Sequence, residues 1–206
     1  MKIPLQYQRS EYDCGPTALL NAISFLFDRE QIPPDIIKYV MMYSLDTFDN
    51  SGEPCKEGTS QMAMMFLSNL FNQYAKSGKL PISSEFLNGE QVQISENSRI
   101  VSALQQGGAV VMRVWEDCGH YVTLTGISDN AITLFDPYIE ECPFEHEDIQ
   151  IIDTQPCMAN RRVKLPVFNH GGEFLYSLEE LDKREAVILF NTETRKTPLR
   201  TIEYFL

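Results

Sequence analysis

One stretch near the N-terminus, Gln8-Arg9-Ser10-Glu11-Tyr12-Asp13-Cys14-Gly15-Pro16-Thr17-Ala18-Leu19-Leu20, sets a glutamine six residues ahead of a cysteine that opens an apolar segment. Proline is tolerated in the first turn of a helix, so Pro16 predicts a helix that starts at Cys14 or Gly15 and runs to about Phe27. Apolar residues recur at helical spacing along it and predict one buried stripe, formed by Leu19, Leu20, Ala22, Ile23, Leu26 and Phe27.

The position of Cys14 at the start of this helix suits a nucleophile. The helix dipole and the free N–H groups at a helix N-terminus both favour the thiolate, which is the form that attacks carbonyl groups. The side-chain amide of Gln8 and the backbone N–H of Cys14 would together form an oxyanion hole. The alternative is that Cys14 is only a small buried hydrophobic residue at a helix end. Whether other catalytic residues follow later in the chain decides between a nucleophile and a core residue.

Composition predicts a single domain over residues 1–206. The chain has 206 residues, of which 43% are hydrophobic, enough for one sizeable core. It lacks an apolar run of membrane-span length and its first residues lack a signal-peptide core, so we expect a cytoplasmic protein. The five cysteines are odd in number and scattered, unlike a disulfide framework. The formal net charge of −12 argues against nucleic acid as a partner.

Helices are predicted to come first and strands second, which indicates an α+β fold with an antiparallel sheet. Further helices are expected over about 34–42 and 59–76, with a polar loop at about 45–58 between them. A fourth helix is expected to be capped by Asn97 or Ser95 and to end at Gln106. Strands are expected at 109–115, 120–128, 131–136 and 185–190. Residues 79–96 fit either a short strand or an irregular connection. Residues 139–167 are expected to be surface loops and short pieces, and Ser177 to cap a short helix.

The partners of a nucleophilic cysteine stand on two of the predicted strands. His120 begins one strand and Asp136-Pro137 ends the next. A thiol nucleophile needs a base to accept its proton, and the base needs a third group to fix its tautomer and stabilise the imidazolium. Cys14, His120 and Asp136, with Gln8 ahead of the cysteine, supply each of these parts.

The register of the two strands decides whether His120 and Asp136 can meet. A two-residue turn at Asp129-Asn130 would pair Thr123 with Asp136 and put Asp136 on the face opposite His120. A three-residue connection, Ser128 to Asn130, or a β-bulge near Gly126, would bring both onto one face. The same register gathers the apolar side chains of Val122, Leu124, Ile132 and Leu134 on that face. We therefore predict a hydrogen bond between His120 and Asp136, with the Cys14 end of the first helix packed against the same face.

The motifs quoted above, with Gly119-His120-Tyr121-Val122, resemble the double-glycine leader peptidases over about residues 5–137. Those are papain-like cysteine peptidase domains at the front of bacteriocin-exporting ABC transporters, together with free-standing relatives. The resemblance implies a papain-like fold, with N-terminal helices on an antiparallel sheet, and the catalytic residues Cys14 (nucleophile), His120 (base), Asp136 (orienting group) and Gln8 (oxyanion donor). It also implies a peptide or protein substrate, cut through a thioester after small residues such as Gly-Gly, and no cofactor.

The chain departs from the transporter type in ways that bear on its substrate. It has no membrane span and no nucleotide-binding domain, so any transporter partner would be a separate and unknown protein. We also expect an inserted loop near 45–58 and a C-terminal extension after about 138. Its substrate can therefore differ from a Gly-Gly leader. Self-processing at Gly107-Gly108 or Gly171-Gly172 is a weaker interpretation than a turn at each pair, because Gln105 and Asn169 replace the apolar residue that the family's leaders carry before the glycines.

Three alternative interpretations use parts of the same residue set. A zinc site built from Cys118, His120, Cys142 and His146 lacks the usual regular spacing, so no metal is expected. A peptide-binding module that does not cut would share the fold, but the complete set of four catalytic residues argues against it. An amide or isopeptide hydrolase, or an acyltransferase, would use the same triad, because hydrolysis and acyl transfer share one thioester.

Overall fold

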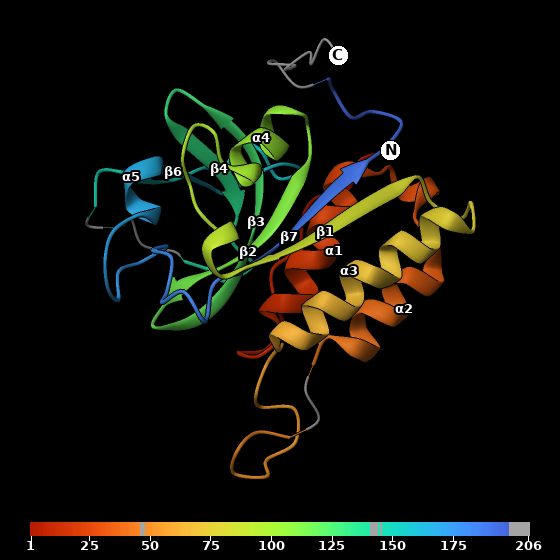
Figure 1. The fold of residues 1–206 in the computed structure, drawn as a ribbon, viewed down its shortest axis with the longest axis horizontal. Helices are drawn as coiled ribbons and strands as arrows, with labels where there is room; N and C mark the ends of the chain where they lie inside the picture. Colours follow the sequence, from red (N-terminus) through yellow and green to blue (C-terminus); the bar gives the residue numbers. More distant parts are fainter. Residues whose placement is uncertain (46–47, 141–143, 145, 198–206) are drawn as a thin grey trace, which may run out of the picture.

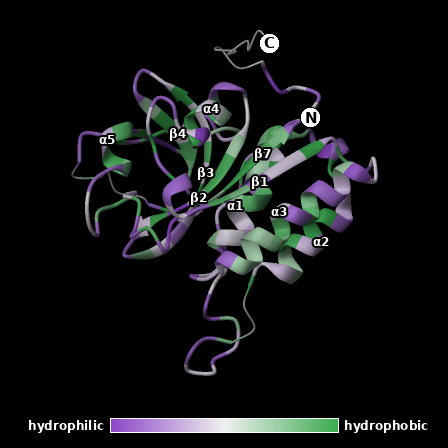
Figure 2. Cartoon of the chain, viewed as in Figure 1, coloured by the Kyte–Doolittle hydropathy of each residue, from purple (hydrophilic) through white to green (hydrophobic). Residues whose placement is uncertain are grey.

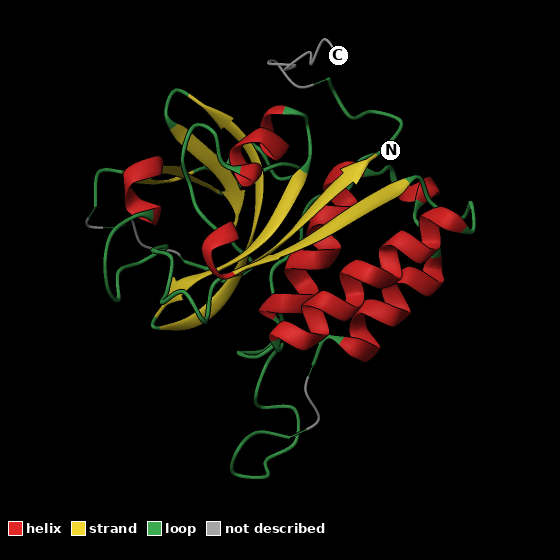
Figure 3. Ribbon diagram, viewed as in Figure 1, coloured by secondary structure: helices red, strands yellow, loops and turns green. Residues whose placement is uncertain are grey.

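The computed structural model describes residues 1–45, 48–140, 144 and 146–197. Three N-terminal helices, α1 (Cys14–Leu26), α2 (Pro34–Tyr43) and α3 (Gln61–Lys76), lie on one side of a seven-stranded sheet (Figures 1 and 3). The smaller helices α4 (Arg99–Gln105) and α5 (Leu165–Phe168) lie on the other side. Two short 3₁₀ helices, Arg29–Gln31 and Gly89–Gln91, complete the helical elements of the described residues.

The strands are β1 (Ile82–Asn88), β2 (Ala109–Glu116), β3 (Cys118–Ser128), β4 (Ala131–Phe135), β5 (Ile149–Ile151), β6 (Arg161–Lys164) and β7 (Glu185–Asn191). Their order across the sheet is β1-β7-β2-β3-β4-β6-β5, and every neighbouring pair is antiparallel. The predicted α+β fold, with helices packed on an antiparallel sheet, is confirmed. The ambiguous segment 79–96 contains a strand, β1, at one edge of the sheet.

Alternation along the strands divides the interior into two cores. Val110, Met112 and Val114 face the core under α4 and α5, whereas Ala109 and Val111 face the core under α1 to α3. Strand β7 is buried along its whole length, since it lies between β1 and β2 with apolar residues on both sides. Figure 2 shows the hydrophobic residues concentrated along these central strands. The sheet is therefore packed on both faces, and this packing fixes the positions of the strand ends. Polar side chains at those ends are held in place by it.

The helix ends follow the sequence closely, with one correction. Helix α1 begins at Cys14, as predicted, and Ser60 caps α3 by accepting a hydrogen bond from the Ala63 N–H at 3.3 Å. Helix α4 is capped by Ser98, whose hydroxyl accepts from the Val101 N–H at 3.2 Å. The predicted caps, Ser95 and Asn97, were wrong, because Ser95 instead accepts from the Ser98 N–H in the turn before the helix.

The β3–β4 hairpin has the required register, and a bulge produces it. The connection is the two-residue turn Asp129-Asn130, both in the left-handed region at φ 49° and 58°, so the three-residue connection was wrong. The register shifts by one residue between Leu124 and Gly126, and beyond this bulge Thr123 pairs with Phe135. The predicted bulge near Gly126 is confirmed. Val122, Leu124, Ile132 and Leu134 share one core, as the register argument required.

The C-terminal third differs from the prediction in two places. Ser177 does not cap a helix, because its hydroxyl donates to the Gly172 carbonyl at 2.8 Å and the chain turns there. Residues 139–167 are not only surface pieces, since they include β5, β6 and α5, and Asn160 and Arg161 are buried. The described part of 45–58 is a loop, as expected; its status as an insertion stays a prediction.

Both Gly-Gly pairs lie in turns, as expected. Gly107 ends α4 at φ 80°, and the N–H of Gly108 donates to the Ala103 carbonyl at 2.9 Å. Gly172 has φ 85° in the turn before Ser177. Across the described ranges, no helix has both the length and the apolar character that crossing a membrane requires.

Candidate active site

Cys14 is the first residue of α1, and its surroundings fix that helix end. Its residue surface is only 8% exposed. A side chain on Gly15 would overlap Thr59, so glycine lets the segment before α3 pack against the start of α1. The Asp13 carboxylate accepts hydrogen bonds from the backbone N–H groups of Arg9 at 3.0 Å and Ser10 at 2.7 Å. These bonds hold the turn that leads into the cysteine.

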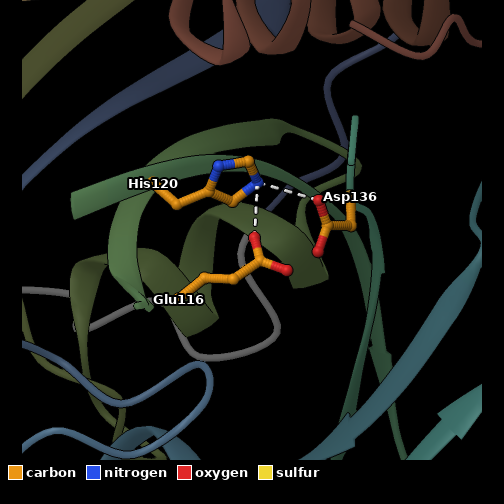
Figure 4. Close-up of side chains that lie close together, drawn as sticks. All are labelled: Glu116, His120 and Asp136. Atoms are coloured by element: carbon orange, nitrogen blue, oxygen red, sulfur yellow. Dashed lines mark hydrogen bonds and ion pairs between the residues drawn. The ribbon is translucent and has the colours of Figure 1, made fainter. Parts of the chain in front are cut away.

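His120 and Asp136 meet as the register predicted. The imidazole Nε2 lies 2.8 Å from Asp136 Oδ1 (Figure 4), and both residues are buried, at 5% and 0% exposure. The other ring nitrogen, Nδ1, points away from the carboxylate. A histidine anchored by a carboxylate at Nε2 presents Nδ1 as its free proton-accepting atom.

Asp136 is held on every side. Its Oδ1 also accepts the Tyr138 N–H at 2.8 Å, and its Oδ2 accepts the Tyr176 hydroxyl at 2.6 Å. Asn160 bonds the Asp136 backbone twice, through N–H at 2.8 Å and C=O at 2.7 Å. Burial alone would raise the pKa of Asp136, but the hydrogen bonds from His120 and Tyr176 outweigh it, so the pKa lies below its ordinary value. The carboxyl group is therefore a fixed anion.

Cys14 affects the pKa of His120 although it belongs to the core on the other face of the sheet. Burial would lower the pKa of His120, yet its hydrogen bonds to Asp136 and Cys14 raise the pKa well above the ordinary value. The body of α1 packs on the face that carries Thr123, whose hydroxyl donates to the Ala18 carbonyl at 2.8 Å. The prediction that the Cys14 end of the helix would pack against the His120 face was wrong, because Cys14 belongs to the core on the opposite face.

Gln8 lies beside the same network. Its backbone N–H donates to the Pro137 carbonyl at 2.9 Å, directly after Asp136. Its side-chain Nε2 donates to the Ser10 carbonyl at 2.8 Å. An amide NH₂ carries two donors, so one N–H remains for a further acceptor. The role of Gln8 as oxyanion donor stays a prediction.

Glu116 is a site residue that sequence reasoning missed. Its Oε2 lies 3.0 Å from His120 Nε2, so two carboxylates approach one ring nitrogen (Figure 4). Burial and repulsion from Asp136 raise the pKa of Glu116 to about 7, against the opposing attraction of His120 and Arg161. Asp117, in the left-handed region at φ 55°, makes the tight connection that turns β2 into β3. No motif marks a glutamate four residues before the histidine, so only the hairpin geometry discloses it.

Tyr176 and Asn160 were missed for a different reason. Both lie in the stretch after Asp136 that carries little periodicity, and each makes its contact over a separation of 24 residues or more. A buried tyrosine in the left-handed region, at φ 64°, has no sequence signature. The part of the chain after Asp136 thus supplies two of the groups that hold this residue.

Glu116, His120 and Asp136 also offer three possible metal-ligand atoms within 4.8 Å of one another. Both oxygens of Asp136 already accept hydrogen bonds, which accounts for its geometry without an ion. In the alternative zinc set, Cys118 is exposed, and Cys142 lies outside the described residues. A buried cysteine near a carboxylate-anchored imidazole is a pair of groups that can act as a nucleophile and its general base.

Comparison with known proteins gives one family and one similar domain. A model of the Peptidase_C39-like family matches residues 1–148. The peptidase domain of Streptococcus ComA, described as a bi-functional ABC transporter involved in a quorum sensing pathway, is similar in structure at 14% sequence identity. The alignment covers 91% of this chain and 97% of that domain, with a TM-score of 0.45. The comparison with curated proteins gave no match.

Proposed function

Because the chain belongs to the Peptidase_C39-like family, we propose that it is a cysteine peptidase in which Cys14, His120 and Asp136 form the catalytic triad. The observation that carries the proposal is the 2.8 Å hydrogen bond between buried His120 and buried Asp136, with Cys14 close enough to raise the pKa of the same imidazole. All three residues lie within the matched range. The family alone suggests the chemistry, and the geometry suggests which side chains perform it.

The proposed reaction begins with a peptide carbonyl beside the Cys14 sulfur. The Cys14 proton passes to Nδ1 of His120, and the sulfur forms a bond to the carbonyl carbon. The resulting oxyanion accepts hydrogen bonds from the Cys14 backbone N–H and the remaining N–H of Gln8. The imidazolium then donates its proton to the leaving amine, the C–N bond breaks, and a thioester remains. Water attacks the thioester with His120 as base, which releases the acid and restores the thiol.

Asp136 acts on this cycle through His120. As a fixed anion it orients the ring so that Nδ1 faces the sulfur, and it stabilises the imidazolium that forms in the first step. Tyr176 and Asn160 hold Asp136 and leave its contact with His120 unobstructed. The network therefore accounts for a base whose orientation is set before substrate binds.

The substrate is proposed to be a peptide or protein cut after small residues such as Gly-Gly, on the strength of the family resemblance alone. The catalytic thiol must stay reduced, and the four described cysteines are free, so we propose that the protein works in the cytoplasm. Thiol trapping of protein isolated from cells tests this compartment. A disulfide between any two cysteines would contradict it.

The direct test is labelling with a peptide electrophile that ends in Gly-Gly and carries a thiol-directed warhead. Intact-mass analysis should show one adduct, located on Cys14, and none in Cys14→Ala. A peptide library incubated with the wild-type protein should be cleaved, with Cys14→Ala inactive. Peptide binding without adduct or cleavage would instead support the binding module. Added amines that appear in the products would indicate acyl transfer rather than hydrolysis.

The oxyanion role has its own test. We expect Gln8→Ala to lower kcat by about 10²–10³, the usual loss for one such donor, with little change in the binding of a non-covalent peptide. If Gln8 is only structural, the variant will be less stable while the folded enzyme keeps its turnover.

A further inference from the structure

The geometry around His120 leaves one charged group without a role in the proposed mechanism. Asp136 accepts hydrogen bonds at both oxygens and anchors the imidazole. Glu116 reaches the same Nε2 from the opposite strand and has no part in holding Asp136. We propose that Glu116 is a positioning residue that stabilises the imidazolium form of His120 and so sets the pH range in which Cys14 reacts. This inference rests on the proposed function.

The two carboxylates make different contacts with Nε2. The ring nitrogen carries a single hydrogen, and the bond at 2.8 Å to Asp136 uses it. Glu116 Oε2, at 3.0 Å, forms an ion-pair contact with the charged ring. Among the described residues this buried oxygen has no hydrogen-bond donor of its own. Its favourable interaction is therefore with the positive charge of the imidazolium, and it is lost when the ring is neutral.

The charged and titratable groups around Glu116 come from several elements. They are Asp117 and Cys118 on the same hairpin, His120 on β3, Asp136 after β4, Arg161 on β6, and Tyr176 in the turn before Ser177. Arg161 is buried and donates from Nη1 to the Asn160 carbonyl at 3.0 Å. Glu116 thus faces two cations and two carboxylates. Of the two cations, His120 is the one in direct contact with Glu116. A change in the charge of Glu116 therefore affects the imidazole most strongly.

The charge of Glu116 changes near neutrality. Its pKa of about 7 means that the carboxyl group is neutral in acid and becomes an anion as the pH rises through that value. Above this pH the imidazolium lies beside two anions and holds its proton more strongly. His120 should therefore keep its proton to a higher pH with Glu116 than without it.

The test is an NMR titration of His120 in three proteins: wild type, Glu116→Gln and Asp117→Asn. The glutamine keeps the shape of the side chain and removes its charge. The control removes a charge one residue away, on an exposed side chain, and asparagine tolerates the left-handed backbone at that position. We expect the titration midpoint of His120 to fall in Glu116→Gln and to stay near the wild-type value in Asp117→Asn. Equal midpoints in all three would overturn the inference.

The pH profile of Cys14 alkylation gives the functional readout. The wild type should show an inflection near pH 7 that Glu116→Gln lacks. If the variant fails to fold, the Glu116 carboxyl carbon is titrated by NMR in the wild type. A midpoint near 7 supports the inference, and one at the ordinary 4.5 overturns it. If Glu116→Gln lowers the His120 midpoint but the wild-type protein cuts no peptide, only the proposed function is refuted. If the wild type cuts peptides but the His120 midpoint does not change in Glu116→Gln, only the role of Glu116 is refuted.

Discussion

Replacing Glu116 with glutamine should make the protein more stable at alkaline pH, since the ionised carboxylate is held in an unfavourable place. Burial and the nearby Asp136 raise its pKa from 4.5 to about 7. The folded state therefore binds more protons than the unfolded state between these values, and stability falls as the pH rises through that window. At about 1.4 kcal/mol per pH unit, the difference corresponds to about 3 kcal/mol. Glutamine, which does not titrate, should avoid this loss.

Urea unfolding of the wild type and of Glu116→Gln between pH 4.5 and 8 measures the effect. We expect the free energies of unfolding to differ little at pH 4.5 and to separate progressively, until the variant is more stable by about 3 kcal/mol above pH 7. Asp117→Asn should show no such pH-dependent gain. A constant offset between wild type and Glu116→Gln across this range would refute the reasoning, because it would mean that Glu116 has the same proton affinity in the folded and unfolded states.

Three further substitutions test the residues that support the site and the packing of the fold. Tyr176→Phe should cost about 1.5–3 kcal/mol of stability, the usual value for a hydrogen bond to a charged group, and should slow Cys14 alkylation because Asp136 loses a donor; an unchanged alkylation rate would contradict this coupling. Gly108→Ala should cost about 1–3 kcal/mol, because its added methyl would press against the Phe190 ring, whereas Gly171→Ala meets no atom within 4 Å and should be close to neutral. Equal stabilities of the two glycine variants, measured by thermal unfolding, would count against the packing at this turn.

Much of the fold could be predicted because local signals and tertiary packing agree. The helix at Cys14 has proline in its first turn and an apolar stripe, and the structure bears out both. The central strands were visible as apolar runs because both of their faces are buried. The hairpin register could also be predicted, because burial of Val122 and Leu124 and the contact of His120 with Asp136 required the same one-residue shift. Either a three-residue connection or a β-bulge could produce that shift. Sequence alone could not choose between a bulge and a longer turn.

The remaining residues of the site make contacts that no periodic pattern in the sequence indicates. Glu116 comes within reach of His120 because the chain reverses at Asp117, and this one-residue connection has no strong signature. Tyr176 donates a hydrogen bond to Asp136, which lies 40 residues earlier in the chain. The sequence around the next residue, Ser177, resembles a helix cap but forms a turn. The side of the sheet on which α1 packs was also misjudged. Alternation shows that two faces differ, but it does not say which elements cover each face.

The measurement that tests the triad most directly is the rate of iodoacetamide alkylation at each cysteine near neutral pH, followed by peptide mass mapping. Cys14 is buried and Cys55 is exposed, so accessibility alone would make Cys55 the faster of the two. If His120 activates the thiol, Cys14 should react faster despite its burial, and His120→Ala should remove that advantage while the protein stays folded by circular dichroism. Faster labelling of Cys55 in the wild type, with no effect of His120→Ala on Cys14, would contradict the assignment of Cys14 as the nucleophile.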